Sequence, residues 1–112
     1  MRAPIPLALY VRGVVMAFDL YAEGFKTSIE QHEISMFHHL NPDKHPQLKQ
    51  MWNDFYDDPT YSFDQSNEIV HELIDLKTLE NLSNSEKFTI EKLLMFFSRA
   101  YISKTMVHSS SD

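Results

Sequence analysis

The side chains in this sequence that could do chemistry are six histidines and sixteen carboxylates, which together could bind a metal ion. His32, Met36 and His39 are spaced at i, i+4 and i+7 and would share one face of an α-helix. Four further polar residues lie nearby in the sequence: Glu33, His38, Asp43 and His45. A zinc site needs about three or four converging ligands, and no H-E-x-x-H or comparable motif is present. Scattered surface histidines explain the pattern equally well, so we predict no metal site and keep a His/carboxylate metal-binding protein as an alternative.

No residue pattern points to catalysis. The chain has two glycines, which excludes a glycine-rich phosphate loop, and it lacks a G-x-S-x-G elbow. The absence of cysteine excludes cysteine nucleophiles, thiolate zinc sites and disulfides. Serines and histidines are abundant, but no spacing selects a triad. We therefore predict a protein that is not an enzyme, with no catalytic residues and no cofactor.

Acidic side chains are concentrated in one segment. Residues 50–76 contain seven acidic side chains and neither Lys nor Arg. Residues 1–49 carry five basic and five acidic side chains, and residues 77–112 carry five basic and four acidic ones. The central segment therefore accounts for the net charge of −6.

The acidic segment is predicted to form a docking surface. Four of its acids fall within about 80° of one predicted helix, opposite the apolar stripe of that helix: Asp64, Glu68, Glu72 and Asp75. The other three acids come earlier and are interleaved with aromatic residues: Asp54, Asp57 and Asp58, with Tyr56 and Tyr61. A solvated helix face is the ordinary explanation of such a stripe. As a docking surface it would steer a basic protein into contact, and it would repel nucleic acid.

Three segments begin with the serine of a capping box, and each would start a helix: Ser28 to Gln31, Ser62 to Gln65 and Ser83 to Glu86. Pro46 marks a fourth start, because a first helical position leaves the backbone N–H without a partner anyway. The predicted helices span about residues 29–40, 46–57, 63–77 and 86–104. Asp57 and Asp58, followed by Pro59, are typical of a helix end and a turn.

Apolar spacing predicts which helix faces are buried. The second helix places Trp52 and Phe55 on its apolar stripe, where core packing explains them better than contact with a partner. The centres of the later stripes should be almost fully buried: Leu73, Leu94 and Phe97. The last helix carries a second stripe at intervals of seven residues: Phe88, Met95 and Ile102. This second stripe should be covered by the sheet, by the N-terminal segment or by another subunit, and we favour a homodimer.

Alternating apolar residues predict strands over residues 5–25, with a turn at Arg12-Gly13. Residues 105–108 are a candidate short closing strand. Residues 1–15 are interpreted either as an added edge strand or as a mis-called extension before Met16. The sequence thus predicts one α+β domain over residues 1–112, with an N-terminal strand or hairpin packed against about four helices. No apolar run is long enough to span a membrane, and no secretory cleavage site follows the N-terminus, so we expect a cytoplasmic protein.

Several runs resemble a loose class of small bacterial proteins: residues 16–25, residues 51–59, Glu72-Leu73, and the closing Phe96-Phe97, Ala100 and Ser111-Asp112. Some members of that class are similar to immunity proteins that neutralise a partner toxin. The resemblance covers most of residues 16–112 and implies an inhibitor, although it assigns no site residues. We therefore expect an acidic, non-enzymatic binding protein that occludes a basic protein partner such as a toxin domain. The alternatives are a small oligomeric scaffold and a metal-binding protein.

Overall fold

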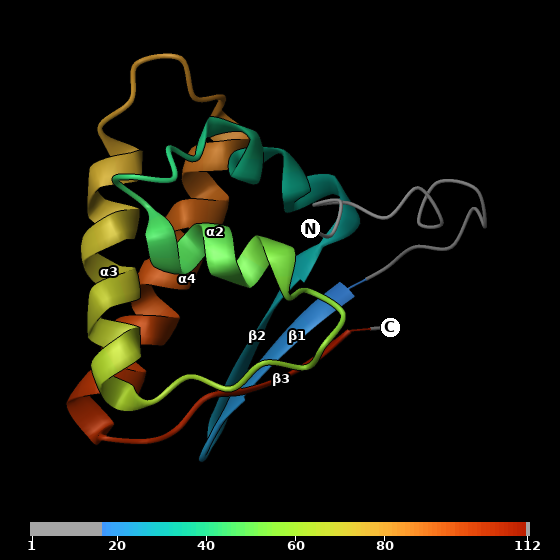
Figure 1. Ribbon diagram of the computed structural model, residues 1–112, viewed down its shortest axis with the longest axis vertical. Helices are drawn as coiled ribbons and strands as arrows, with labels where there is room; N and C mark the ends of the chain where they lie inside the picture. The colour runs from blue at the N-terminus through green and yellow to red at the C-terminus, as the bar shows by residue number, and fades with distance from the viewer. Residues whose placement is uncertain (1–16, 112) are drawn as a thin grey trace.

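A three-stranded antiparallel sheet and four helices make up the computed structural model, which describes residues 17–111. In chain order the elements are β1 (Ala17–Ala22), β2 (Phe25–Glu30), η1 (Gln31–His39), α2 (Pro46–Asn53), α3 (Phe63–Lys77), α4 (Asn84–Ser103) and β3 (His108–Ser111) (Figure 1). The predicted α+β class is confirmed, with strands near the N-terminus and a short strand at the C-terminal end. The predicted closing strand spanned residues 105–108, whereas β3 begins at His108.

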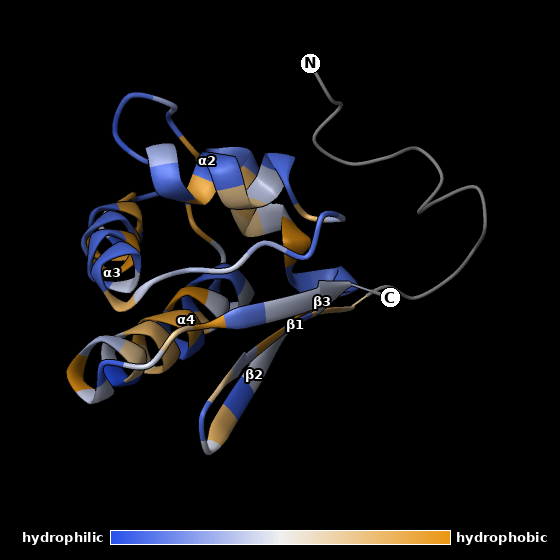
Figure 2. Cartoon of the chain, turned by 60° about the horizontal axis from the view of Figure 1, so that its bottom comes forward, coloured by the Kyte–Doolittle hydropathy of each residue, from blue (hydrophilic) through white to orange (hydrophobic). Residues whose placement is uncertain are grey.

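Strand β1 is the middle of the sheet, with order β2-β1-β3. Its side chains alternate as the sequence pattern predicts, because neighbouring residues in a strand point to opposite faces. Phe18 and Leu20 are fully buried, whereas Tyr21 is exposed on the other face. The helices gather on the buried side of the sheet (Figure 2).

The described hairpin turns at Glu23-Gly24, between β1 and β2. Gly24 has φ +87°, a left-handed conformation that a residue with a side chain rarely adopts. The turn predicted at Arg12-Gly13 lies outside the described residues. The helix predicted from residue 29 is wrong at its start, because Ser28 pairs with Asp19 inside β2 and is not the serine of a capping box.

The segment after β2 is a 3-10 helix, η1, rather than the predicted α-helix. Its exposure therefore repeats every three residues, with exposed side chains at His32, Ser35 and His38. Glu33 and Met36 are buried between these positions. The capping box of this helix is formed by Glu30 and Glu33, two residues later than predicted.

The start signals of the remaining helices are confirmed, although α4 begins at Asn84, two residues before its predicted start. Pro46 occupies the first turn of α2, and Ser62 and Ser83 form capping boxes at α3 and α4 with Gln65 and Glu86. Helix α2 ends at Asn53, four residues before its predicted end at residue 57.

The core lies between the sheet and the helices, and α3 packs closely against α4. Leu73 and Phe97 are fully buried as predicted, but Leu94 is only partly buried and its neighbour Leu93 occupies the core position. Trp52 and Phe55 are confirmed as core residues. The Trp52 ring stacks on Phe37 with 4.7 Å between ring centroids, and the Phe55 ring stacks on Phe18 at 4.4 Å.

The second stripe of α4 is uncovered by the described residues. Phe88, Met95 and Ile102 are 64%, 76% and 77% exposed. The sheet was one of the three expected covers, and it does not cover this stripe; nor do residues 17–25. The rest of the N-terminal segment lies outside the described residues.

Candidate partner-binding surface

Three acidic side chains lie exposed on one side of α3 and define the acidic face: Asp64, Glu68 and Asp75. Their spacing places them within a sector of about 40°. The sequence segment 50–76 contains no Lys or Arg that could neutralise them locally. Like charges so close together repel one another on a helix, so this surface favours an approaching positive charge.

Asp75 is partly engaged inside the molecule. The buried ring of His45 accepts the Asn41 backbone N–H at Nδ1, with 2.9 Å between the nitrogens. The proton of the neutral ring therefore sits on Nε2, which donates to Asp75 Oδ2 at 2.8 Å. The Asp75 side chain remains 49% exposed, so it still contributes negative charge to the acidic face.

Glu72 does not belong to the acidic face, and the prediction that it points outward is wrong. It is buried, and its two carboxylate oxygens accept the backbone N–H groups of Gln47 and Leu48 at 3.0 and 2.9 Å. These are free amides in the first turn of α2, which need acceptors. Burial raises the pKa of Glu72, although the two amides oppose that shift. Helix α2 covers the edge of the acidic stripe.

The three acids of the earlier group lie apart from the acidic face, at the end of α2 and in the loop that follows. Asp54 is half-buried and accepts a hydrogen bond from the Gln50 side chain at 2.7 Å. Asp57 is exposed, and Asp58 adopts a left-handed conformation with φ 49°. The Asp58 carboxylate accepts the Ser111 backbone N–H at the end of β3. This second group therefore lies beside the sheet edge, and part of it holds β3 in place.

The two tyrosines of the earlier group differ in burial. Tyr61 is 3% exposed and packs edge-on against Phe97, so it cannot reach a partner. Burial raises the pKa of Tyr61, which keeps its hydroxyl protonated. Tyr56 is half-buried against Phe55.

Two residues beside the acidic face were missed. His71 and Ile74 are exposed on the outward side of α3, and Ile74 retains 53% of its accessible surface. Apolar spacing predicts Ile74 on the buried stripe with Ile69 and Leu73, and this prediction is wrong, since Ile74 falls about 80° from Asp64 on the outward side of the helix. An exposed aliphatic side chain beside charged ones is a candidate short-range contact.

The suggested metal ligands do not converge. No group of three or more potential metal ligands occurs among residues 17–111. Because η1 is a 3-10 helix, His32 and Met36 point in different directions, with His32 exposed and Met36 fully buried. His39 lies 3.1 Å from the carboxylate of Glu86, with which it pairs when protonated.

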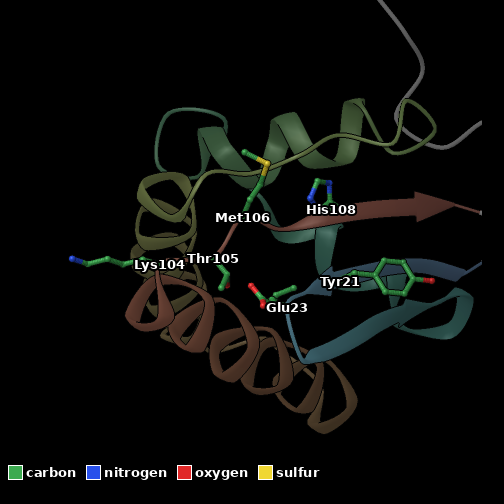
Figure 3. Close-up of a pocket in the computed structure, with 7 residues that line it drawn as sticks. Tyr21, Glu23, Lys104, Thr105, Met106 and His108 are labelled. Carbon is green, nitrogen blue, oxygen red and sulfur yellow. The ribbon is translucent and has the colours of Figure 1, made fainter.

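A pocket of about 450 Å³ lies where the hairpin tip meets the connection from α4 to β3. Its polar side chains diverge (Figure 3). Lys104 points away from the pocket on one side and Tyr21 on the other, while Glu23 lies near Thr105. Catalysis needs a nucleophile, a base and an orienting group within hydrogen-bond reach, and these side chains show no such arrangement.

Two further carboxylates are buried and serve the fold. Glu33 accepts two hydrogen bonds from Lys92, one from the Thr89 hydroxyl and one from the Glu30 backbone N–H. Burial alone would raise the pKa of Glu33, but these bonds outweigh it and lower the pKa. In Glu86 the Ser83 backbone N–H lowers the pKa against the opposing effect of burial, with help from His39.

Comparison with protein-family models, with curated proteins and with solved structures found no match for this chain. Among residues 17–111, no helix has both the length and the apolar character needed to cross a membrane.

Proposed function

We propose that this protein is a non-enzymatic binding protein of the immunity or inhibitor type, which occludes a basic protein partner such as a toxin domain. The observation that carries the proposal is the exposed acidic face of α3. Its three carboxylates lie on one side of a single helix, in a segment free of Lys and Arg. Concentrated negative charge accelerates encounter with a positive surface.

The acidic face lies on a helix whose other side packs firmly into the core. Helix α3 begins with a capping box, and Ile69, Leu73 and Leu76 on its opposite side are fully buried. A face that does not rearrange loses little conformational entropy when a partner binds. Ile74, exposed beside the acids, supplies apolar contact once charge has brought the two proteins together.

The mechanism needs no chemistry from this chain. A bound inhibitor covers basic residues that its partner would use on a substrate, so activity stops while the complex lasts. The same negative charge disfavours direct binding to nucleic acid.

The test is a charge-neutral double variant, Asp64→Asn with Glu68→Gln. Both side chains are exposed, and this pair avoids Glu72 and Asp75, which have internal roles. The matched control is Glu23→Gln with Asp43→Asn, which changes the net charge equally at two exposed sites away from α3. Basic proteins captured from the source organism on the wild-type chain would then be measured by surface plasmon resonance.

We expect the α3 variant to lower the association rate about tenfold at low salt, while the control changes it far less. Added salt should weaken wild-type binding and leave the α3 variant nearly unaffected. Equal effects of the two double variants would mean that net charge alone matters. Unchanged binding in both would refute the acidic face as the docking surface.

A further inference from the structure

The outer edge of β2 carries backbone groups that point away from the rest of the sheet. β2 is an end strand, because the strand order is β2-β1-β3. The two-residue turn at Glu23-Gly24 closes on the pair Ala22 and Phe25, so the odd-numbered residues of β2 hydrogen-bond to β1. The even-numbered residues therefore direct their N–H and C=O groups outward: Lys26, Ser28 and Glu30.

Two of these three residues have an unpaired backbone. The Glu30 N–H donates to the Glu33 carboxylate at 2.9 Å, which agrees with its outward direction. Within residues 17–111, no hydrogen bond uses the N–H and C=O groups of Lys26 and Ser28. An unpaired strand edge is a template on which a further strand can form its backbone hydrogen bonds.

This edge opens into a groove between β2 and α4, which we call the edge groove. Its volume is about 380 Å³, and α4 contributes the exposed side chains of Phe88 and Met95 to its lining. A second hollow of about 290 Å³ adjoins the same stretch of strand and is lined by Lys26, Thr27 and Ser28. Helix α4 thus packs against β2 and leaves its edge accessible. A strand placed at the usual spacing of about 4.8 Å from β2 would lie in the edge groove.

We propose that an extended, acidic segment of a partner protein binds in the edge groove as a fourth strand beside β2. Its backbone hydrogen-bonds to Lys26 and Ser28, and the side chains on one of its faces pack on Phe88 and Met95. The unpaired edge and the exposed apolar side chains meet at one groove, so a single added strand covers both. This site uses no residue of the acidic face and does not depend on the proposed function.

Two cations at the edge groove have no acidic partner in the described part of the chain: Lys26 and Arg99. The Arg99 guanidinium lies 4.2 Å from the centroid of the Phe25 ring. This contact holds the cation at the groove without neutralising its charge. Lys26 is exposed on the strand itself.

The other charged residues that line the groove add no net charge. Lys92 is paired with Glu33 at 2.6 Å, and Glu91 is paired with Lys77 at 3.2 Å. The edge groove is therefore positive through Lys26 and Arg99. A lysine on an edge strand ordinarily deters pairing with a further strand. Here the same charge favours an acidic strand and disfavours a basic one.

The probe is a capped, fluorescently labelled hexapeptide, Glu-Val-Glu-Val-Glu-Val, titrated with the full chain. We expect a dissociation constant on the order of 10–100 µM, as for a small interface. The matched control peptide is Lys-Val-Lys-Val-Lys-Val, which has the same backbone and apolar side chains and should bind at least about tenfold more weakly. No binding of the acidic peptide at about 1 mM, or equal binding of the two peptides, would overturn the proposal.

Amide hydrogen exchange followed by NMR locates the peptide. The amides of Lys26 and Ser28 should exchange freely in the unbound chain, and saturating peptide should slow them at least about tenfold. The amides of Thr27 and Ile29, which face β1, are the internal control and should be protected in both states. Peptide binding without slower exchange at Lys26 and Ser28 would contradict strand addition.

Protection of Lys26 and Ser28 in the unbound chain would also overturn the proposal, because the edge would already be occupied. Sedimentation equilibrium would then show whether the occupant is a second copy or, in a monomer, residues 1–16.

A proline tests the backbone contact directly. Ser28→Pro removes an outward N–H without removing a hydrogen bond to β1, and proline is tolerated at such edge positions. Ser28→Ala is the matched control, because it keeps the N–H and loses only the hydroxyl that donates to Glu30. The acidic peptide should bind Ser28→Pro at least about tenfold more weakly and Ser28→Ala within about twofold of wild type. Equal binding to the two variants would refute pairing with β2.

Charge reversal tests the selectivity even if the proline variant does not fold. Lys26→Glu should weaken binding of the acidic peptide about fivefold or more and strengthen binding of the lysine peptide. Lys44→Glu, an equal change at an exposed position in the turn before α2, should bind both peptides like the wild type. A Lys26→Glu variant with the wild-type preference would overturn the assignment of an acidic occupant.

Discussion

At the scale of single residues, burial separates the carboxylates that hold the fold from those that face solvent. Glu33, Glu72 and Glu86 are buried, and each accepts at least one backbone N–H group. A buried carboxylate needs such donors to offset its lost hydration. These three side chains therefore act as structural acceptors, while the acidic face retains free negative charge.

The lowered pKa of Glu33 makes folding sensitive to acid. Its carboxyl binds a proton less readily in the folded chain than in the unfolded one, where the ordinary value is 4.5. Its stabilising contribution is therefore complete above about pH 4.5 and is lost as the pH falls through the lower folded pKa. Glu33→Gln should cost about 1–3 kcal/mol of unfolding free energy at pH 7, and the difference from wild type should shrink below pH 4.5.

Urea unfolding at several pH values measures this dependence. Glu80→Gln, a change at an exposed position, is the control and should cost less than about 0.5 kcal/mol at pH 7. A gap between Glu33→Gln and wild type that widened as the pH fell would contradict the assignment.

Removing the polar group of Tyr61, unlike that of Glu33, should not lower the free energy of unfolding. Its hydroxyl is buried and has no hydrogen-bond partner in the described part of the chain. Removing an unpaired buried polar group while keeping the ring should leave stability unchanged or raise it by about 1 kcal/mol. Tyr61→Phe should therefore melt at or above the wild-type temperature, whereas Tyr61→Ala should lose about 3–5 kcal/mol through the cavity it leaves. A clear loss in Tyr61→Phe would show that the hydroxyl has a partner.

At the scale of elements, α2 depends on a residue of another helix. Helix α2 spans eight residues and its N-cap, His45, makes no side-chain capping bond. Glu72 of α3 supplies the missing acceptors to Gln47 and Leu48. So short a helix is unstable alone, and this contact fixes its first turn against α3.

Removing that contact should therefore loosen α2. Glu72→Ala leaves two amides without acceptors and should cost about 2–3 kcal/mol. Glu68→Ala, one helical turn away and exposed, loses a single surface hydrogen bond to Gln47 and should cost less than about 1 kcal/mol. Denaturant titration of the two variants compares them directly. Similar costs at the two positions would contradict the capping role of Glu72.

Neighbouring leucines on α4 test which face is core. Leu93 is fully buried, whereas Leu94 is only partly buried. Leu93→Ala should cost about 2–5 kcal/mol, as should Leu73→Ala on α3. Leu94→Ala should cost no more than about 1–2 kcal/mol, since less apolar area returns to water. Denaturant titration measures the unfolding free energy of these variants. An equal loss at Leu93 and Leu94 would contradict this assignment of the core side of α4.

Local signals predicted helix starts where a side chain alone satisfies the free amides, as at Ser62 and Ser83. They failed at Ser28, because pairing with β1 satisfies the backbone better than a capping box would. The segment from Gln31 was predicted with the wrong type of helix, because its polar residues were assigned to the wrong repeat. Polar residues at 32, 35 and 38 fit the three-residue repeat of a 3-10 helix. Because 3-10 helices rarely extend over nine residues, the sequence predicts an α-helix there instead.

At the scale of the whole molecule, the sheet joins distant parts of the chain. Strand β1 pairs with β2 through a local hairpin and with β3 from the far end of the described residues. Tyr61 extends the β3 side through a bridge to Val107, and the Ser109 hydroxyl donates to the Pro59 carbonyl. These contacts hold the loop between α2 and α3 against the sheet.

Truncation after Val107 should therefore disrupt the whole fold. It removes β3, exposes one edge of the central strand and frees the Pro59 carbonyl. We expect a loss of more than about 3 kcal/mol, a large share of the 5–15 kcal/mol typical of a domain. Thermal unfolding followed by circular dichroism measures it, with Ser110→Ala, an exposed position on β3, as the control. Cooperative unfolding near the wild-type temperature would show that β3 is dispensable.

Composition and periodicity were sufficient for the fold class, because apolar alternation and helical spacing are local properties. The candidate surface was only partly predictable, since exposure depends on which element covers which. By helical spacing, Glu72 and Asp64 both lie opposite the apolar stripe of α3, but α2 packs over Glu72 and leaves Asp64 exposed. Nothing in the spacing of residues 63–77 reveals that cover.

The position of β3 in the chain also bears on how the protein is made. The central strand can acquire its second neighbour only after residues 108–111 have left the ribosome, since those residues follow the other elements of the described chain. During synthesis one edge of β1 in the nascent hairpin stays unpaired until that last strand arrives. A message cut short before this point would yield a product with an open strand edge, which proteases and chaperones recognise. Pairing of β3 with β1 thus completes the sheet and removes that open edge from the newly made chain.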